Sequence, residues 1–261
     1  MIGAIAGDII GSVYEHHNIK VVDFPLFNPG CRFTDDTVLT VAIADAILSG
    51  SGYAGKLREY CLLYPERGYG PGFRRWAVAG RSTPYNSKGN GSAMRVSSIG
   101  SAFGTLEEVL RESKRSAEVT HNHPEGIKGA QAVASAVFLA RTGTSKEDMK
   151  AYIRETFEYD LSEPIDSIRT HYGFDVTCAG SVPQAITAFL ESEGYEDAIR
   201  KAISIGGDSD TIACIAGAIA EAFYRGVPQN IADFALSKLD DTLRNVIAAF
   251  RQTYRGVVSW I

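Results

Sequence analysis

Two segments of this sequence are apolar around almost their whole circumference when they are drawn as helices, and they constrain the fold more than any other feature. They are TDDTVLTVAIADAILSG, which begins at Thr34, and TIACIAGAIAEAFYRG, which begins at Thr211. A helix that is rich in Ala, Gly, Val and Ile on every side lies inside a helical protein and not on its surface. The sequence therefore predicts two central helices that other helices surround.

Signals for further helices occupy most of the remaining chain. TLEEVLRESKRSAEV and SKEDMKAYIRETFEY each begin with an N-cap residue followed by acids in the first turn. Pro124 and Pro183 each predict a helix with proline in its first turn, the second of which should end at Gly194. YEDAIRKAISIGG and IADFALSKLDDTLRNVIAAFRQTYRG continue the helical pattern to the C-terminal region.

Strand signals are weak by comparison. They are limited to VVDFPLF near residue 21 and GVVSW near residue 256, and the first contains a proline. The alternation of strands and helices that characterises a Rossmann or barrel fold is absent. We expect one compact all-α domain over residues 1–261.

The charge and the apolar runs of the sequence indicate which kinds of partner we expect. The formal charge of −5 argues against nucleic acid as the main partner, because phosphate binding requires a basic face. No apolar run approaches the ~20 residues of a membrane span, and the N-terminal segment lacks the cationic start of a signal peptide. We therefore expect a cytoplasmic protein without a membrane partner.

Two acidic motifs precede the central helices, Thr34-Asp35-Asp36-Thr37 and Gly206-Gly207-Asp208-Ser209-Asp210-Thr211. Either could be a helix cap, because Thr, Asp and Ser are preferred there. A cap needs a single oxygen, however, and these motifs bring four carboxylates to two core helices. Clustered carboxylates repel one another unless protons or cations compensate, and an oxygen-only ligand set suits Mg²⁺ or Mn²⁺. Whether the two motifs meet in space stays open at this point.

Glycine-rich turns form a second set of candidates, Gly68-Tyr69-Gly70-Pro71-Gly72 and Ser87-Lys88-Gly89-Asn90-Gly91. Such turns expose backbone N–H groups that can hold a phosphate, although ordinary turns have the same composition. The segment Thr120-His121-Asn122-His123 offers either a zinc-binding histidine pair or a polar turn before the next helix.

Taken in order, these motifs resemble the ADP-ribosylglycohydrolase family, which includes the dinitrogenase-reductase-activating glycohydrolases and the ADP-ribosyl-acceptor hydrolases. The resemblance rests on GAIAGDIIGSVYE, FTDDT, GYGPGF, SKGNGSAMRV, THNHPEGIKGA and GGDSDTIACIAGAIAEAFYRG. It implies an all-α orthogonal helical bundle with a binuclear metal site, occupied by two Mg²⁺ or Mn²⁺ ions. It also implies cleavage of the glycosidic bond between ADP-ribose and an acceptor on a protein or small molecule, with arginine the first expectation and serine the second.

The resemblance also assigns site residues. The metal ligands that it implies are Thr34, Asp35, Asp36, Asp208, Asp210 and Thr211. The residues that it implies for the diphosphate and riboses of ADP-ribose are Gly70, Gly72, Ser87, Gly89, Asn90 and His121. Glu15 matches a family glutamate near the scissile bond. The implied mechanism is attack of water on the anomeric carbon, with Glu15, Asp35, Asp36 and Asp210 as the catalytic residues.

Four residues depart from or lie outside this set. Lys88 stands where many relatives carry an aromatic residue that in some stacks on adenine, and Tyr85 is a candidate for that contact. Asp8 is expected to support the site from behind, and Arg95 is expected to be structural.

Three alternative functions remain at this stage. One is a zinc amidohydrolase that uses His121 and His123. Another is a non-catalytic ADP-ribose-binding protein on the same scaffold. The third is a hydrolase of a different ribosyl or ADP-ribosyl small molecule, which Lys88 keeps open. The resemblance does not choose between Mg²⁺ and Mn²⁺ or give an oligomeric state.

Overall fold

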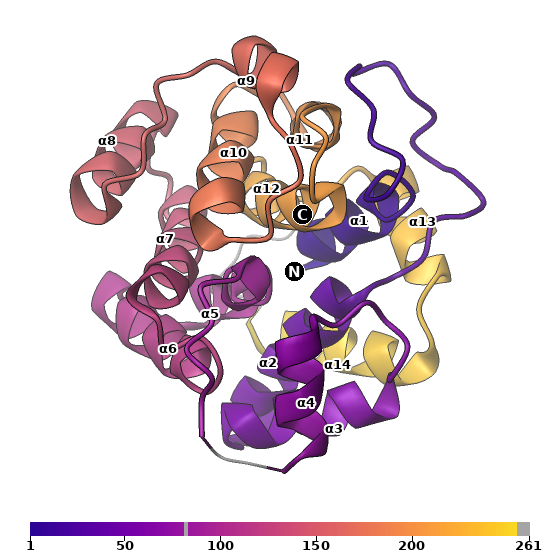
Figure 1. Ribbon diagram of the computed structural model, residues 1–261, viewed down its shortest axis with the longest axis vertical. Coiled ribbons are helices and arrows are strands. Elements are labelled where there is room, and N and C mark those ends of the chain that lie inside the picture. Colours follow the sequence, from indigo (N-terminus) through magenta and orange to yellow (C-terminus); the bar gives the residue numbers. More distant parts are fainter. Residues whose placement is uncertain (81–82, 255–261) are drawn as a thin grey trace.

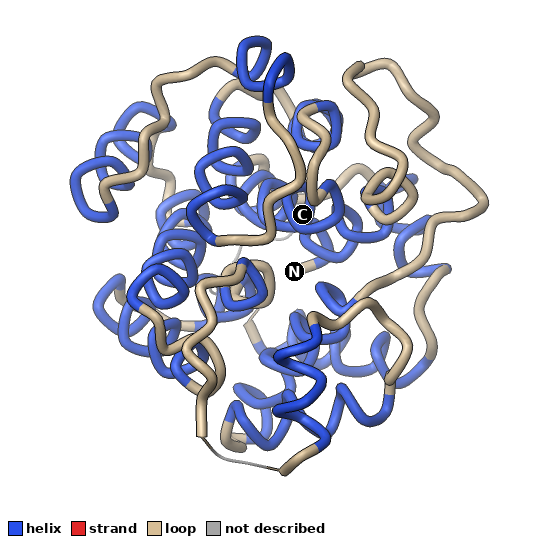
Figure 2. The backbone as a smooth tube through the Cα atoms, in the orientation of Figure 1, coloured by secondary structure: helices blue, strands red, loops and turns tan. Residues whose placement is uncertain are grey.

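The computed structural model of this protein describes residues 1–80 and 83–254, and their regular structure is helical (Figures 1 and 2). The helices are α1 (Ile2–Gly11), α2 (Asp35–Ser49), α3 (Tyr53–Leu63), α4 (Pro71–Val78), α5 (Ser97–Ala102), α6 (Leu106–Glu118), α7 (Pro124–Arg141), α8 (Lys146–Phe157), α9 (Ile165–His171), α10 (Cys178–Leu190), α11 (Tyr195–Ser204), α12 (Ser209–Phe223), α13 (Gln229–Ser237) and α14 (Asp241–Thr253). A 3-10 turn, η1, covers Asn90–Ser92. The predicted all-α fold is confirmed.

The centre of the molecule is the pair α1 and α12, which lie together in the middle of the ribbon (Figure 1). All of α1 is buried, and α12 is buried from Ser209 to Ala222. Helices α7, α10 and α11 pack against α12, and α13 packs against α1. The central position predicted for α12 is therefore confirmed. Helix α2 is buried from Asp36 to Ala44, and its last residues reach the surface.

Glycines allow α1 and α12 to lie in backbone contact. A Cβ atom on Gly7 would lie 2.1 Å from the carbonyl oxygen of Ala213, and one on Gly217 would lie 2.3 Å from that of Gly3. No real Cβ atom tolerates such distances, so only glycine permits this crossing. The close approach brings Asp8, which follows Gly7, to the helix that carries Asp210.

Most predicted helix starts agree with the structure. The side chain of Thr105 accepts a hydrogen bond from the backbone N–H of Glu108 in a full capping box, and Ser145 caps α8 through a hydrogen bond from the backbone N–H of Asp148. Pro124 is the first residue of α7. These signals are local, since each depends on atoms three or four residues apart.

The predicted start and end of α10 are wrong. The helix begins at Cys178, because the side chain of Thr177 accepts a hydrogen bond from Gly180 N at 3.1 Å. Pro183 therefore lies inside the helix and not in its first turn. The helix ends at Leu190, and Gly194 is the residue before α11.

The C-terminal helical segment is divided in two. Asp240 interrupts it and accepts a hydrogen bond from Leu243 N at 3.0 Å as the N-cap of α14. The weak strand signal VVDFPLF is a loop, and GVVSW lies outside the described residues. None of the helices in the described part of the chain combines the length and apolar character that crossing a membrane requires.

Candidate active site

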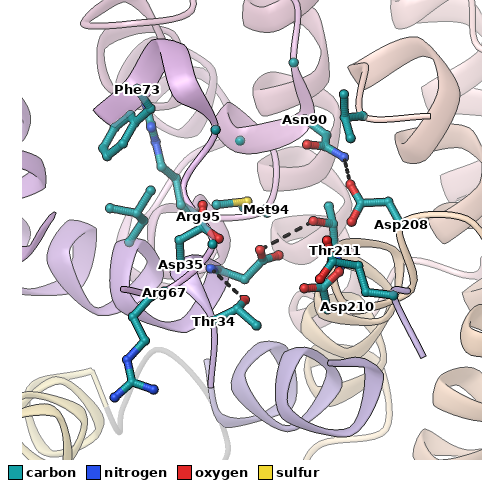
Figure 3. A pocket seen from close by; sticks show the side chains of 18 of the residues that line it. Thr34, Asp35, Arg67, Phe73, Asn90, Met94, Arg95, Asp208, Asp210 and Thr211 are labelled. Atoms are coloured by element: carbon teal, nitrogen blue, oxygen red, sulfur yellow. Dashed lines mark hydrogen bonds between the residues drawn. The ribbon is translucent and has the colours of Figure 1, made fainter. Parts of the chain in front are cut away.

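A cavity of about 530 Å³ lies where three helix N-termini converge, those of α2, α4 and α12 (Figure 3). The segment from Tyr85 to Arg95 and the loop that carries His121 complete its wall. Helix N-termini carry partial positive charge and unpaired N–H groups, so their convergence favours an anionic ligand.

Every site residue that the sequence predicts lines this one cavity. These residues are Glu15, Thr34, Asp35, Asp36, Gly70, Gly72, Ser87, Gly89, Asn90, His121, Asp208, Asp210 and Thr211. Tyr85 also lines the cavity, whereas Lys88 is exposed and is not part of its lining. The residues come from distant parts of the chain, and the tertiary fold alone brings them together.

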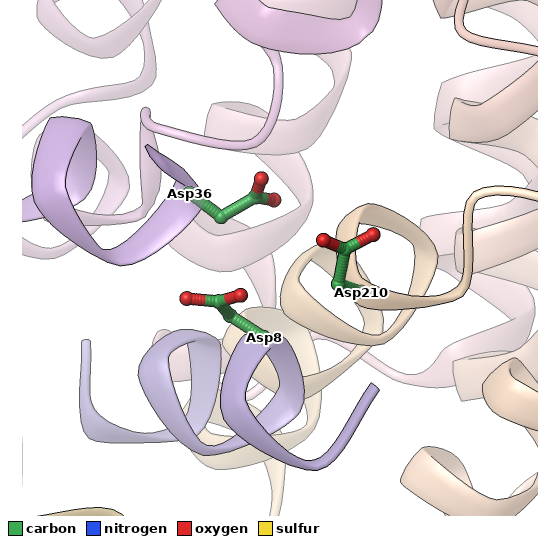
Figure 4. Close-up of side chains that lie close together, drawn as sticks. All are labelled: Asp8, Asp36 and Asp210. Carbon is green, nitrogen blue, oxygen red and sulfur yellow. The ribbon is translucent and has the colours of Figure 1, made fainter. Parts of the chain in front are cut away.

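The two acidic motifs meet on one side of the cavity. Oxygen atoms of Asp8, Asp36 and Asp210 lie within 4.8 Å of one another (Figure 4), and so do oxygen atoms of Glu15, Asp208 and Asp210. Asp210 belongs to both groups. Among the described residues, the groups that could hold a metal ion consist of carboxylates alone, a donor set that suits a hard divalent cation.

The N-terminus of α2 is held by Asp8, the acid expected to support the site from behind. Its carboxylate accepts hydrogen bonds from Thr34 N at 3.0 Å, Thr34 Oγ1 at 2.6 Å and Thr37 N at 3.1 Å. The hydroxyl of Thr37 donates a further one. Asp8 thus orients Thr34, and its oxygens lie close enough to those of Asp36 and Asp210 to share a cation.

The carboxylates of this cluster are destabilised in their charged form. Burial raises the pKa of Asp36 well above its usual value, and the negative charges of Asp8 and Asp35 add to the effect. Burial also raises the pKa of Asp210 well above its usual value, followed by the charge of Asp208. Bound cations would reverse both shifts.

A buried oxygen of the cluster has no hydrogen-bond partner among the described residues. Asp36 Oδ1 is buried without a hydrogen bond, while Asp36 Oδ2 accepts a long one from Thr211 Oγ1 at 3.4 Å. A buried carboxylate oxygen without a donor is costly. This orphaned atom and the all-oxygen donor set fit a divalent cation.

Asp208 is positioned by the turn before α12. Gly206 and Gly207 have φ angles of 76° and 72°, values that favour glycine. The side-chain amide of Asn90 donates to Asp208 Oδ2 at 2.6 Å (Figure 3) and also to Ser181 Oγ at 2.9 Å. Asn90 therefore contacts an acid of the cluster directly.

Asp35 is placed differently from the other acids. It lines the cavity, but its carboxylate belongs to neither close group of acids. Its backbone N–H donates to the carbonyl of Arg67 at 2.7 Å. Burial raises the pKa of Asp35 well above its usual value, and the charge of Asp8 contributes next.

The glycine turns line a further part of the same cavity. A Cβ atom on Gly91 would lie 3.3 Å from His121 Nε2, whereas one on Gly70 would meet nothing within 4 Å. Gly89 N donates to Ser87 Oγ at 3.1 Å, which fixes the turn. Burial lowers the pKa of His121 well below its usual value, so its ring is neutral at pH 7.

The two histidines of the zinc hypothesis, His121 and His123, differ in position and in their contacts. His121 lines the cavity, and His123 caps α7 through a hydrogen bond from Glu125 N to its Nδ1 at 3.1 Å. Neither belongs to a group of potential metal ligands among the described residues. The structure therefore does not support a zinc site formed by His121 and His123.

Arg67, Phe73 and Arg95 also line the cavity, although the sequence predicted no role in the site for them. Arg67 packs its guanidinium 3.7 Å from the centre of the Phe33 ring. No short-range pattern marks these residues. For Asp8 a signal exists, because it is the single acid in the otherwise apolar segment GAIAGDIIG.

Comparison with known proteins gives consistent results. The family model described as ADP-ribosylglycohydrolase matches residues 1–256. The human protein named ADP-ribosylhydrolase ARH3 is 28% identical over 85% of this chain and 83% of its own length. The ADP-ribosylarginine hydrolase Tri1 of Pseudomonas putida is 27% identical over 86% of this chain and 69% of its own.

A solved structure has the same fold. This structure, an ADP-ribosylglycohydrolase-related protein complex, superposes with a TM-score of 0.75 at 23% identity, covering 97% of this chain and 96% of the other. At that identity the likeness concerns the fold alone.

Proposed function

This chain belongs to the ADP-ribosylglycohydrolase family, and from that premise we propose that it is a metal-dependent hydrolase that releases ADP-ribose from an ADP-ribosylated acceptor. One observation carries the proposal. The carboxylates of two distant motifs meet beside a cavity that is otherwise lined by glycine turns and helix N-termini. Such a cavity can hold a polyanionic ligand at one end and cations at the other.

We propose that Thr34, Asp36, Asp208, Asp210 and Thr211 hold two Mg²⁺ or Mn²⁺ ions, with Asp35 at the edge of the site. The support is the shared position of Asp210, the buried unpaired oxygen of Asp36 and the absence of nitrogen or sulfur from the close groups among the described residues. Two bound divalent cations would neutralise the acids and lower the pKa of a coordinated water.

The remaining chemistry is assigned to side chains of this chain. Burial raises the pKa of Glu15, the charge of His16 opposes this rise and that of Asp208 adds to it, and the net rise favours the protonated carboxyl. We propose that Glu15 protonates the acceptor oxygen or nitrogen as it leaves the anomeric carbon, while Asp36 and Asp210 orient the attacking water. Gly70, Gly72, Ser87, Gly89 and His121 are proposed to hold the diphosphate and riboses, with Asn90 linking that side to Asp208.

The acceptor is the finer part of the proposal. Arginine is our first expectation and serine the second; the name of the similar Tri1 protein gives ADP-ribosylarginine as its substrate. The cavity lining carries both signs of charge at Glu15, Glu66, Arg32 and Arg67. Direct comparison of the two acceptors is therefore required.

The deciding experiment measures ADP-ribose released from ADP-ribosyl-arginine and ADP-ribosyl-serine peptides, with Mg²⁺ or Mn²⁺ and with a chelator. We expect chelator-sensitive release that is faster from one of the two peptides. Binding of free ADP-ribose without release from either peptide would favour a binding protein or a small-molecule hydrolase. If the protein does not bind ADP-ribose and releases none from either peptide, the proposal is refuted.

Metal should stabilise the protein more strongly as the pH rises. The pKa values of Asp36 and Asp210 are raised in the folded state, so the unfolded chain loses these protons first and the metal-free protein loses stability above the usual aspartate range. Cations offset this loss. We expect the rise in melting temperature on adding Mg²⁺ or Mn²⁺ to be larger at about pH 8 than at about pH 5. Equal rises at both pH values would contradict the proposed site.

A further inference from the structure

Arg95 is a fully buried arginine in the wall of the cavity, with an exposed fraction of 0% (Figure 3). It lies in the short segment between η1 and α5. Its Nη2 donates to the carbonyl of Ser116 at 2.9 Å and to Thr120 Oγ1 at 3.0 Å. These two contacts hold the side chain but carry no negative charge.

The charge of Arg95 is unmatched in the described part of the chain. Its Nε and Nη1 are buried without hydrogen-bond partners, and no carboxylate there forms an ion pair with it. Burial lowers the pKa of Arg95 to about 10, which leaves it charged at neutral pH. Removing one partner from a buried ion pair is strongly destabilising because it leaves an uncompensated charge, so a buried cation without an anion indicates a missing partner.

The surroundings of Arg95 indicate where that partner binds. The centre of the Phe73 ring, on the first turns of α4, lies 6.0 Å from its Cζ. After burial, the charge of Arg95 is the second cause of the lowered pKa of His121, whose ring borders Gly91. Arg95 therefore lies on the glycine-turn side of the cavity.

We propose that Arg95 is the internal counter-ion of the substrate diphosphate, an inference that rests on the proposed function. The diphosphate supplies the negative charge that the protein lacks at this point. With Arg95 beside Phe73 and His121, and the close groups of acids around Asp210, the electrostatic field orients the substrate so that its distal ribose faces those acids. Arg95 is thus a positioning residue that favours diphosphate-containing substrates.

Two substitutions separate charge from structure. Arg95→Gln removes the charge but keeps an amide donor, and Arg95→Lys keeps the charge but removes the planar fork. Arg141→Met is the matched control, because Arg141 also donates to backbone carbonyls, those of Gly100 and Phe103, and does not line the cavity.

The measurement is calorimetric titration of the Mg²⁺-loaded proteins with ADP-ribose. We expect Arg95→Gln to weaken binding by about tenfold to a hundredfold, as for a lost bond to a charged group, and Arg95→Lys to bind within about tenfold of wild type. Arg141→Met should bind as wild type does. A merely structural role predicts similar losses for the Gln and Lys variants.

The outcomes distinguish this inference from the proposed function. Wild-type affinity in a folded Arg95→Gln protein overturns the role of Arg95 alone. A folded Arg95→Lys protein that binds a hundredfold more weakly than wild type overturns the charge argument even if Arg95→Gln does not fold. Failure of the wild-type protein itself to bind ADP-ribose overturns the proposed function, and the inference falls with it.

Discussion

Asp210→Asn is expected to lower the turnover of ADP-ribosylated substrate by about a thousandfold or more, because bound cations contribute several kcal/mol to the transition state. Asp210 is the one acid that belongs to both close groups of carboxylates in the described part of the chain. Its loss would therefore weaken both proposed cation sites at once. The measurement is chelator-sensitive release of ADP-ribose from the preferred peptide.

The fold should survive this substitution. Asparagine has nearly the same shape, and it removes one of several buried like charges, so the metal-free variant should melt at or above the wild-type temperature. The gain in melting temperature on adding metal should shrink. Near-normal turnover in folded, metal-replete Asp210→Asn protein would contradict the proposed mechanism.

Asp241→Asn serves as the matched control. Asp241 also lies in the first turn of a helix, but its side chain is 91% exposed and it pairs with Arg244 on the surface of α14. Exposed pairs of this kind contribute ~0–1 kcal/mol. We expect its turnover and its response to metal to equal those of the wild-type protein.

Gly7→Ala is expected to destabilise the protein by about 3 kcal/mol, at the upper end of overpacking effects, because the added Cβ would lie 2.1 Å from Ala213 O. The obstacle is backbone, which cannot rotate away as a side chain can. Helices α1 and α12 must separate, and for a chain of this size the melting temperature should fall by about 10 °C.

The same separation should reduce activity in whatever protein remains folded. Gly7 precedes Asp8, which holds Thr34 in place, and Ala213 lies one turn after Asp210 on α12. We therefore expect weaker metal stabilisation together with the lower melting temperature. Differential scanning calorimetry with and without Mg²⁺ measures both effects.

Gly55→Ala is the control for Gly7→Ala, because it adds the same methyl group to a helix at an uncrowded position. Gly55 lies within α3, and a Cβ atom there would meet nothing within 4 Å. Replacing glycine by alanine in such a helix stabilises by ~0.4–1 kcal/mol, chiefly through the unfolded state. If Gly7→Ala and Gly55→Ala had the same effect on stability, close packing of α1 on α12 would not be what requires glycine.

Local patterns account for the helices that were predicted well. The capping box at Thr105, the cap at Ser145 and the proline at Pro124 act within one turn, so their atoms are neighbours in the sequence. The apolar circumference of α12 likewise predicts its burial. At Pro183 the same reasoning was wrong, because Thr177 supplied an earlier cap that outweighed the preference of proline for a first turn.

The sequence by itself determined the helical class, the acidic and glycine motifs and, through their order, the family. Only the tertiary structure decided which side chains share a site. It brought Asp36 to Asp210, separated His123 from His121 and left Lys88 outside the cavity. It also buried Arg95 without an anion. The physical reason is the separation along the sequence of the residues that interact. Helix caps depend on residues a few positions apart, whereas this site joins residues as distant in the sequence as Asp8 and Asp210. Those two residues meet because glycines let α1 and α12 pack in backbone contact.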